Sequence, residues 1–276
     1  MKNLYSTIIK AIVNTSTRSC NKMSGKSFTN KVVFISGASS GIGAATAIEF
    51  TKEGATVVIN GRNETKLKNV YKQCEAFGKK PLIIKADISK DEEAKAAIDE
   101  TIKTFGKLDV LVNNAGFSRS GSILDGNLIA SFDEIMATNV RGAMHLTALA
   151  APHLIKTKGN IINISSVAGT AVPLLPQFIS YCVSKAALDH FTRCSALELS
   201  KHGIRVNTVS PGPVTTDFQI NAGIKDVMAD RTIPTALNRV SESIEIADLI
   251  LFLASDKAKA ITGSNYVSDN GFLLVN

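Results

Sequence analysis

Short apolar runs alternate with helical patterns along most of this chain. Seven runs predict buried parallel strands, at Val32–Ser36, Thr56–Asn60, Leu82–Ala86, Val110–Val112, Asn160–Ile164, Arg205–Val209 and about Asn265–Ser268. Helices are expected after Gly43, over Glu64–Phe77, after Asp91, up to about Lys156, over Tyr181–Lys201 and around Ile246–Leu253. Repeated strand–helix–strand units with right-handed crossovers predict an α/β fold, a single-domain doubly wound parallel sheet of about seven strands with helices on both faces.

The first 30 residues break this pattern. They contain no acidic residue and are rich in Ser, Thr, Asn and Lys, and apolar residues recur there at helical spacing from Leu4 to Val13. We therefore divide the chain into an N-terminal arm, 1–30, and one catalytic domain, 31–276. The arm resembles a mitochondrial transit peptide. The alternatives are a disordered tail without a targeting role, or a cytoplasmic protein whose translation starts at Met23.

The distribution of charge along the chain limits the classes of binding partner that the protein is expected to have. The chain has 31 basic and 24 acidic residues, a net charge of +7, but six basic residues precede the first acidic one, Glu49. The remainder carries 25 basic and 24 acidic residues, so composition gives the domain no basic footprint for nucleic acid. We also expect no transmembrane segment, because no apolar run reaches 18 residues. The four cysteines and four histidines show no metal-ligand spacing, and we predict no metal site.

A glycine-rich turn follows the first predicted strand. Its pattern is G-x-x-x-G-x-G, and a helix is predicted immediately after it. Glycines allow a tight turn and a close approach to a pyrophosphate, and the helix N-terminus offers free N–H groups to that anion. The residues expected to bind a dinucleotide here are Gly37, Ser39, Ser40, Gly41, Ile42 and Gly43.

Over residues 31–271, the chain resembles the short-chain dehydrogenase/reductase family. Further marks are an aspartate ending the third strand, Asn-Asn-Ala-Gly ending the fourth, Y-x-x-x-K on a helix, and a Pro-Gly segment after the sixth strand. The resemblance implies a Rossmann-type fold and a nicotinamide cofactor. It adds these residues to the cofactor site: Asp87, Ile88, Asn113, Ala115, Gly116, Tyr181, Lys185, Pro211, Gly212, Val214 and Thr216. The C-terminal part is similar to the branch that contains 3-oxoacyl-carrier-protein and carbonyl reductases.

The end of the second predicted strand distinguishes NADP(H) from NAD(H). Gly61 falls where NAD-preferring members have an aspartate, and Arg62 follows it. A guanidinium can bind the 2′-phosphate of NADP with two parallel hydrogen bonds. We therefore predict NADP(H), with NAD(H) as the less favoured cofactor. The alternative interpretation of Arg62 is a solvated loop charge. One observation weighs against NADP(H): Ser40 stands where many NADP-binding members have a second basic residue.

Four residues make up the expected catalytic group. Tyr181 and Lys185 are four residues apart and share a helix face, where the ammonium is expected to lower a phenol pKa that is ordinarily about 10. The resemblance assigns Ser166 to the substrate oxygen and Asn139 to a proton relay through Lys185. Ser165 is the rival serine, but neighbouring side chains of a strand point to opposite faces.

These residues together predict an NADP(H)-dependent oxidoreductase that interconverts a carbonyl and a secondary alcohol. The apolar segment Asp217–Val240 favours a small apolar substrate, such as a steroid, a terpenoid or a 3-oxoacyl thioester. A cofactor-binding sensor or scaffold is the alternative class, but it has no need of Ser166, Tyr181 and Lys185 together. By analogy with the family we expect a homo-oligomer, a tetramer, although Asn270 departs from the usual Asp-Gly-Gly.

Overall fold

The computed structural model describes residues 26–172, 175–218 and 234–275. One seven-stranded sheet runs through it in the order β3-β2-β1-β4-β5-β6-β7, and every neighbouring pair is parallel. The strands are β1 (Val32–Ile35), β2 (Thr56–Gly61), β3 (Leu82–Lys85), β4 (Val110–Asn113), β5 (Asn160–Ile164), β6 (Arg205–Pro211) and β7 (Asn265–Ser268). The predicted doubly wound sheet is confirmed.

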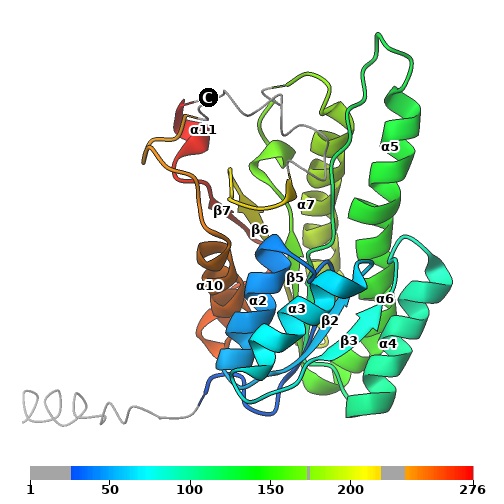
Figure 1. Ribbon diagram of the computed structural model, residues 1–276, viewed down its shortest axis with the longest axis vertical. Helices are drawn as coiled ribbons and strands as arrows, with labels where there is room; N and C mark the ends of the chain where they lie inside the picture. Colours follow the sequence, from blue (N-terminus) through cyan, green and yellow to red (C-terminus); the bar gives the residue numbers. More distant parts are fainter. Residues whose placement is uncertain (1–25, 173–174, 219–233, 276) are drawn as a thin grey trace, which may run out of the picture.

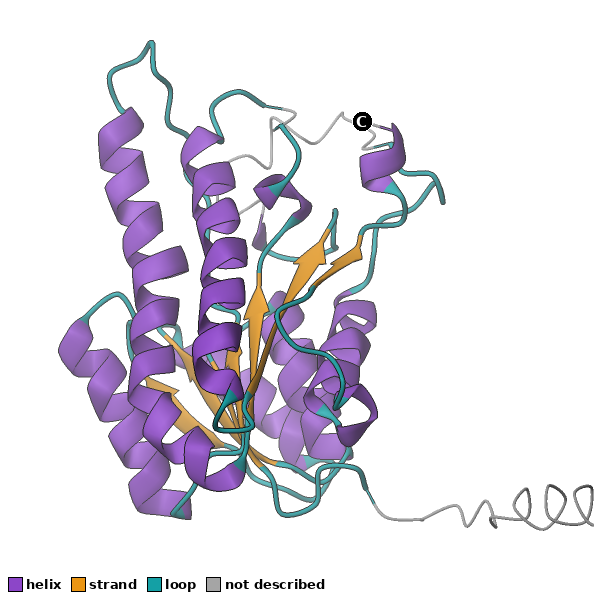
Figure 2. Cartoon of the chain, turned by 180° about the vertical axis from the view of Figure 1, so that it is seen from behind, coloured by secondary structure: helices purple, strands orange, loops and turns teal. Residues whose placement is uncertain are grey.

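Helices cover both faces of this sheet. One face carries α2 (Gly41–Lys52), α3 (Glu64–Glu75) and α10 (Ser243–Ala254) (Figure 1). The opposite face, seen in Figure 2, carries α4 (Asp91–Phe105), α6 (Ala143–Thr157) and α7 (Ile179–Ser200). In β1, Val33 and Ile35 pack into the first layer, whereas Val32 and Phe34 pack into the second. Central strands such as β1 and β4 are buried on both faces and consist almost wholly of apolar residues, which is why the sequence revealed them.

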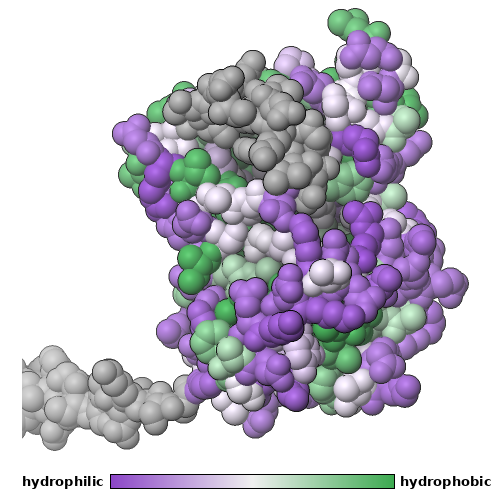
Figure 3. All heavy atoms as spheres, viewed as in Figure 1, coloured by the Kyte–Doolittle hydropathy of each residue, from purple (hydrophilic) through white to green (hydrophobic). Residues whose placement is uncertain are grey.

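Helix ends follow local signals in the sequence. The Asn63 side chain caps α3 by accepting a hydrogen bond from the Lys66 N–H at 3.0 Å. Three acidic residues open α4, and Gly106 ends it with φ of 72°. The exposed side of α3 is hydrophilic, and Figure 3 shows such side chains gathered over this part of the molecule. No helix among the described residues is long and apolar enough to cross a membrane.

The segment before Lys156 differs from the single helix that was expected. It consists of α5 (Leu128–Met136), the π-helical turn η1 (Ala137–Gly142) and then α6. Wider π turns commonly occur at functional sites, and here the turn contains Asn139. The remaining short elements are η2 (Val167–Gly169), η3 (Asp256–Ala258) and α11 (Phe272–Val275).

The folded body begins before the expected boundary at residue 31. Phe28 is only 4% exposed, and its ring meets the Phe50 ring of α2 edge-on, with centroids 4.8 Å apart. Its N–H donates to the Glu53 carbonyl at 2.9 Å. A lone aromatic residue in a polar stretch gives no periodic signal, so the pattern did not place it in the core. The rest of the predicted arm, 1–25, lies outside the described residues.

We expect Phe28→Ala to lower the free energy of unfolding by about 3 kcal/mol, because it empties a packed site against α2. Phe77→Ala is the control: Phe77 is 43% exposed and lies under the Lys52 ammonium, so its loss should cost less than about 1 kcal/mol. Denaturant unfolding of both variants measures the difference. Equal losses would contradict the placement of Phe28 in the core.

Candidate active site

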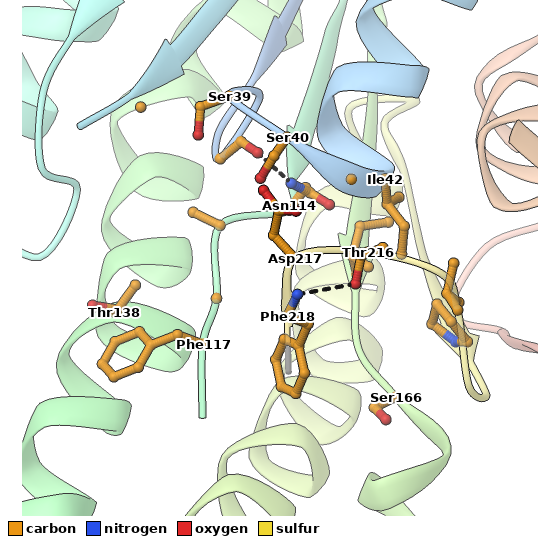
Figure 4. A pocket seen from close by; sticks show the side chains of 18 of the residues that line it. Ser39, Ser40, Ile42, Asn114, Phe117, Thr138, Ser166, Thr216, Asp217 and Phe218 are labelled. Atoms are coloured by element: carbon orange, nitrogen blue, oxygen red, sulfur yellow. Dashed lines mark hydrogen bonds between the residues drawn. The ribbon is translucent and has the colours of Figure 1, made fainter. Parts of the chain in front are cut away.

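A cavity of about 850 Å³ opens at the carboxyl edge of the sheet. It is lined by the segments that follow β1, β2, β3, β4, β5 and β6, because all parallel strands end at the same edge. The strand order reverses between β1 and β4, and ligands of doubly wound sheets bind in the crevice that such a reversal leaves. Figure 4 shows Ser39 and Ser40 at one end of the cavity and Ser166 at the other, with Thr216 and Phe218 between them.

The glycine-rich turn forms one wall and fits a dinucleotide. Gly37 has φ of 65°, and a Cβ on it would lie 2.7 Å from the Ala115 Cα. A Cβ on Gly43 would lie 2.4 Å from the Gly37 carbonyl oxygen. At the start of α2, the Ser40 side chain makes no capping hydrogen bond, and the first turn holds no acidic residue. The backbone N–H groups of that turn are therefore available to a phosphate.

Ser36 and Asn114 hold this turn against the end of β4. The Ser36 hydroxyl accepts hydrogen bonds from the Asn114 and Ala115 N–H groups, both at 3.1 Å. The Asn114 amide donates to the carbonyls of Ser36 and Gly37, both at 3.0 Å. Sequence reasoning did not select Asn114, whose side chain lines the cavity.

Asn113 was expected at the cofactor, but its side chain makes its contacts inside the fold. Its side chain is 3% exposed and donates to Thr147 Oγ1 at 3.0 Å and to Asn163 Oδ1 at 2.9 Å. These partners lie within the fold, on α6 and β5, and the Asn113 side chain does not line the cavity. Gly43 also lies behind the cavity wall, where it allows the turn to pack closely.

Two cations stand near the end of β2. Arg62 Nη1 lies 3.6 Å from Asp87 Oδ2, and Lys66 Nζ lies 2.6 Å from Asp217 Oδ2. All four residues line the cavity. Burial opposes ionisation of Asp87, but hydrogen bonds from Ser89 and the Arg62 charge hold its pKa below the ordinary value. Lys66 was missed in the sequence; the available signal was its position four residues after Arg62 in the first turn of a helix.

Ser166, Tyr181 and Lys185 meet at the other end of the cavity. Ser166 follows β5 and caps η2, where its hydroxyl accepts a hydrogen bond from the Ala168 N–H at 3.2 Å. The Lys185 ammonium donates to the Ile164 carbonyl at 2.7 Å and lies 5.6 Å from the centroid of the Tyr181 ring. The structure thus brings together three residues selected from distant sequence motifs.

The family follows from this arrangement and from comparison with known proteins. A family model described as enoyl-(acyl carrier protein) reductase matches residues 37–273. The chain belongs to the short-chain dehydrogenase/reductase family. A glucose 1-dehydrogenase from Gluconobacter oxydans is 38% identical over 252 residues, 90% of this chain and 93% of the relative. A 3-oxoacyl-[acyl-carrier-protein] reductase from Staphylococcus epidermidis is 34% identical over 249 residues, 89% of this chain and 100% of the relative.

Solved structures of the family are similar to this fold. A short-chain dehydrogenase from Burkholderia cenocepacia in complex with NADP has a TM-score of 0.81 and 31% identity. One from Mycobacterium paratuberculosis bound to NAD has a TM-score of 0.81 and 29% identity. In both comparisons, 90% of this chain and 99% of the other chain are covered. This short-chain dehydrogenase/reductase is accordingly an oxidoreductase whose structural neighbours bind nicotinamide cofactors of either kind.

The protonation of Tyr181 differs from the sequence-based expectation. Burial raises the pKa of this phenol to about 12, although a hydrogen bond with Ser166 opposes the shift. Burial also lowers the pKa of Lys185 to about 8, which the charge of Asp189 opposes. The ammonium is held by the Ile164 carbonyl and lies over the ring, and its charge does not outweigh the burial of the phenol. Tyr181 is therefore a neutral, proton-bearing phenol in the free protein.

Asn139 and Ser165 support this catalytic group from behind. Asn139 Oδ1 accepts from the Phe117 N–H, and its Nδ2 donates to the Phe117 carbonyl, both at 3.0 Å, and to Ser184 Oγ at 3.1 Å. The Asn139 side chain thus fixes the segment after β4 against α7. The expected role of Asn139 in a proton relay through Lys185 stays a prediction. Ser165 donates to the Lys185 carbonyl at 3.2 Å, on the side away from Ser166 expected from strand alternation.

Further cavity residues were not selected from the sequence. Phe117, Arg119, Glu134, Thr138, Val240 and Phe272 line it. Arg119 pairs with Glu134, with Nη2 2.7 Å from Oε1, and its guanidinium lies 5.7 Å from the centroid of the Phe117 ring. Of the apolar segment expected to cover the substrate, Phe218 lies 5.4 Å from Tyr181 between ring centroids. Residues 219–233 of that segment lie outside the described residues.

We expect Tyr181 to remain un-ionised in the free protein up to about pH 10, where an ordinary tyrosine is half ionised. The chain has four tyrosines and no tryptophan, so tyrosinate absorbance can be measured directly. Subtracting the titration of Tyr181→Phe from that of the wild type isolates Tyr181, and this difference should stay near zero up to that pH. A difference with its midpoint well below pH 10 would show instead that Lys185 governs the phenol.

Proposed function

We propose that this protein is an NADP(H)-dependent oxidoreductase that interconverts a carbonyl and a secondary alcohol on an apolar substrate. The observation that carries the proposal is the convergence of Ser166, Tyr181 and Lys185 at one end of a cavity whose other end is a glycine-rich helix N-terminus with two cations beside it. When bound, the reduced nicotinamide supplies the hydride that reaches the carbonyl carbon.

The side chains supply the remaining chemistry. The Ser166 hydroxyl donates a hydrogen bond to the carbonyl oxygen, which gains negative charge as the carbon is reduced. The buried Tyr181 phenol gives its proton to that oxygen and becomes a phenolate. The Lys185 ammonium, 5.6 Å from the ring centroid, stabilises this phenolate until it regains a proton from solvent. The alcohol product therefore contains one hydride and one proton more than the carbonyl substrate.

The cavity lining supports an apolar substrate. Phe117, Phe218, Val240 and Phe272 line the cavity, where the nearby charges of Arg119 and Glu134 are paired with each other. A 3-oxoacyl thioester is the alternative substrate class, supported by the similarity to the Staphylococcus epidermidis reductase. A cofactor-binding sensor or scaffold is the second class of function, and turnover distinguishes it from an enzyme.

We expect Tyr181→Phe to lower kcat by about 100-fold or more, because the proton donor is lost, while NADPH still binds. The assay is NADPH oxidation with a panel of apolar ketones and 3-oxoacyl thioesters. Tyr71→Phe, a partly buried tyrosine on α3, is the matched control and should keep wild-type activity. Undiminished turnover by Tyr181→Phe would overturn the mechanism. Tight NADPH binding by the wild type without turnover on any compound would favour a sensor.

NADP(H) preference is supported by charge at the end of β2. Gly61 leaves that position without a carboxylate, while Arg62 and Lys66 line the cavity beside it. Both cations already face carboxylates, Asp87 and Asp217, within 4 Å. A 2′-phosphate would gain two charge-assisted contacts here, and NADH would gain neither.

We therefore expect Arg62→Gln and Lys66→Gln each to raise the Kd for NADPH by about tenfold and to change the Kd for NADH by less than about twofold. Lys68→Gln is the matched control, because Lys68 lies on the same helix and pairs with Glu64 outside the cavity. Fluorescence titration of the bound nicotinamide measures all these affinities. Equal losses for the two cofactors, or none, would contradict the assignment of the 2′-phosphate site.

Assembly and location are further parts of the proposal. We propose a homo-oligomer, a tetramer by family analogy, and the support is exposed apolar residues on α10 and β7, namely Ile244, Phe252 and Val267.

We also propose mitochondrial import, supported by the acid-free, basic composition of residues 1–30. The mature protein from its native source should then begin inside the arm, at neither Met1 nor Met23. Sequencing its N-terminus tests this, and a terminus at either methionine would contradict import with cleavage.

A further inference from the structure

Four ionisable residues follow one stripe of α7 at intervals of four. They are Tyr181, Lys185, Asp189 and Arg193, and the first two belong to the proposed catalytic group. Side chains four residues apart lie one above the other on a helix, so Asp189 is the next neighbour of Lys185 away from the cavity. Asp189 is only 8% exposed. A carboxylate is almost never buried to this extent unless it is paired.

The surroundings of Asp189 connect it to the catalytic residues. A Cβ on Gly169 would lie 2.6 Å from Asp189 Oδ2, so the turn η2 that Ser166 caps rests directly on this carboxylate. The Ser165 hydroxyl lies beside the carboxylate and favours its charged form, and Asn265 Nδ2 of β7 lies 3.5 Å from Oδ2. Asp189 Oδ1 has no hydrogen-bond partner among the described residues. If packing were the only requirement at this position, an apolar side chain would fill the space without the cost of desolvating a charge.

The charged groups that face Asp189 both lie on α7. They are Lys185 on one side and Arg193 on the other, whereas η2, the end of β5 and β7 present only the neutral residues Gly169, Ser165 and Asn265. Burial raises the pKa of Asp189, and the Ser165 hydroxyl and these two cations oppose the shift. Lys185, in turn, has Asp189 as the anion beside it and the Ile164 carbonyl as the acceptor of its proton.

We propose that Asp189 is a positioning residue that keeps the buried Lys185 protonated and seats the turn following Ser166 on α7. This inference rests on the proposed function, because Lys185 matters there as the ammonium beside Tyr181. Burial lowers the pKa of Lys185 to about 8, close to neutral pH, and the charge of Asp189 opposes that shift. Without the carboxylate, the ammonium would be lost at lower pH. Asp189 therefore extends the pH range in which the site is correctly protonated.

The test is Asp189→Asn, which removes the charge and keeps the size. Reduction needs the Lys185 ammonium, so kcat/KM with NADPH falls as pH rises through the pKa of this group. In the variant, the midpoint of that fall should move to lower pH by about one unit, and the KM for NADPH should stay within about twofold of the wild type at pH 6. Glu198→Gln, an exposed carboxylate on the same helix, is the control and should leave the midpoint unchanged.

Ser165→Ala provides a second variant if Asp189→Asn does not fold. It removes the hydroxyl that favours the charged carboxylate, so the midpoint should move in the same direction by a smaller amount. A merely structural role would lower melting temperature or kcat and leave the midpoint in place. An unmoved midpoint, or one moved to higher pH, overturns the inference. Full turnover by Tyr181→Phe would instead overturn the proposed function, so the two failures are distinguishable.

Discussion

The hydrogen bonds around Ser36 join the carboxyl ends of β1 and β4, and the site depends on this junction. Ile35 pairs with Val112 in the sheet, and the Ser36 N–H continues the ladder to the Val112 carbonyl at 3.0 Å. Beyond it the strand order reverses, so the two segments separate and leave a crevice. The glycines of the first segment and the amide of Asn114 keep the separation small. The start of α2 is thereby aimed into the same cavity as the catalytic end of β5.

A second constraint is burial at that catalytic end. Burial disfavours the charged form of any group, so it raises the pKa of the Tyr181 phenol and lowers that of the Lys185 ammonium. The phenol therefore keeps its proton, whereas the ammonium is held in its charged form only weakly. The contacts of Lys185 with the Ile164 carbonyl and of Asp189 with its surroundings act against that weakness. The protonation of Tyr181 and Lys185 thus depends on groups from β5 and α7 that are far apart in the sequence.

The sequence predicted the strand positions, the doubly wound sheet and the main site residues because their signals are local. Central strands such as β1 and β4 consist almost wholly of apolar residues, and Ser166, Tyr181 and Lys185 belong to short motifs. It could not decide which of two adjacent asparagines faces the cavity, because that depends on how β4 ends against α6 and β5. The sequence also could not predict the direction of the Tyr181 pKa shift, because the position of the Lys185 ammonium depends on the Ile164 carbonyl, 21 residues away. Phe28 gave no periodic signal, and the position of Lys66 four residues after Arg62 does not by itself show that its side chain lines the cavity, so both roles emerged from the packing and the cavity wall.

We infer above all that the two ends of this cavity hold a nicotinamide dinucleotide and a carbonyl group in contact with the residues at the ends of β1, β2 and β5. A crystal structure of the protein with NADPH and an apolar ketone measures this most directly. It should show the ketone oxygen within hydrogen-bond distance of both the Tyr181 and Ser166 hydroxyls, and the 2′-phosphate beside Arg62. A dinucleotide bound outside the cavity, or a ketone oxygen directed away from both hydroxyls, would contradict the account.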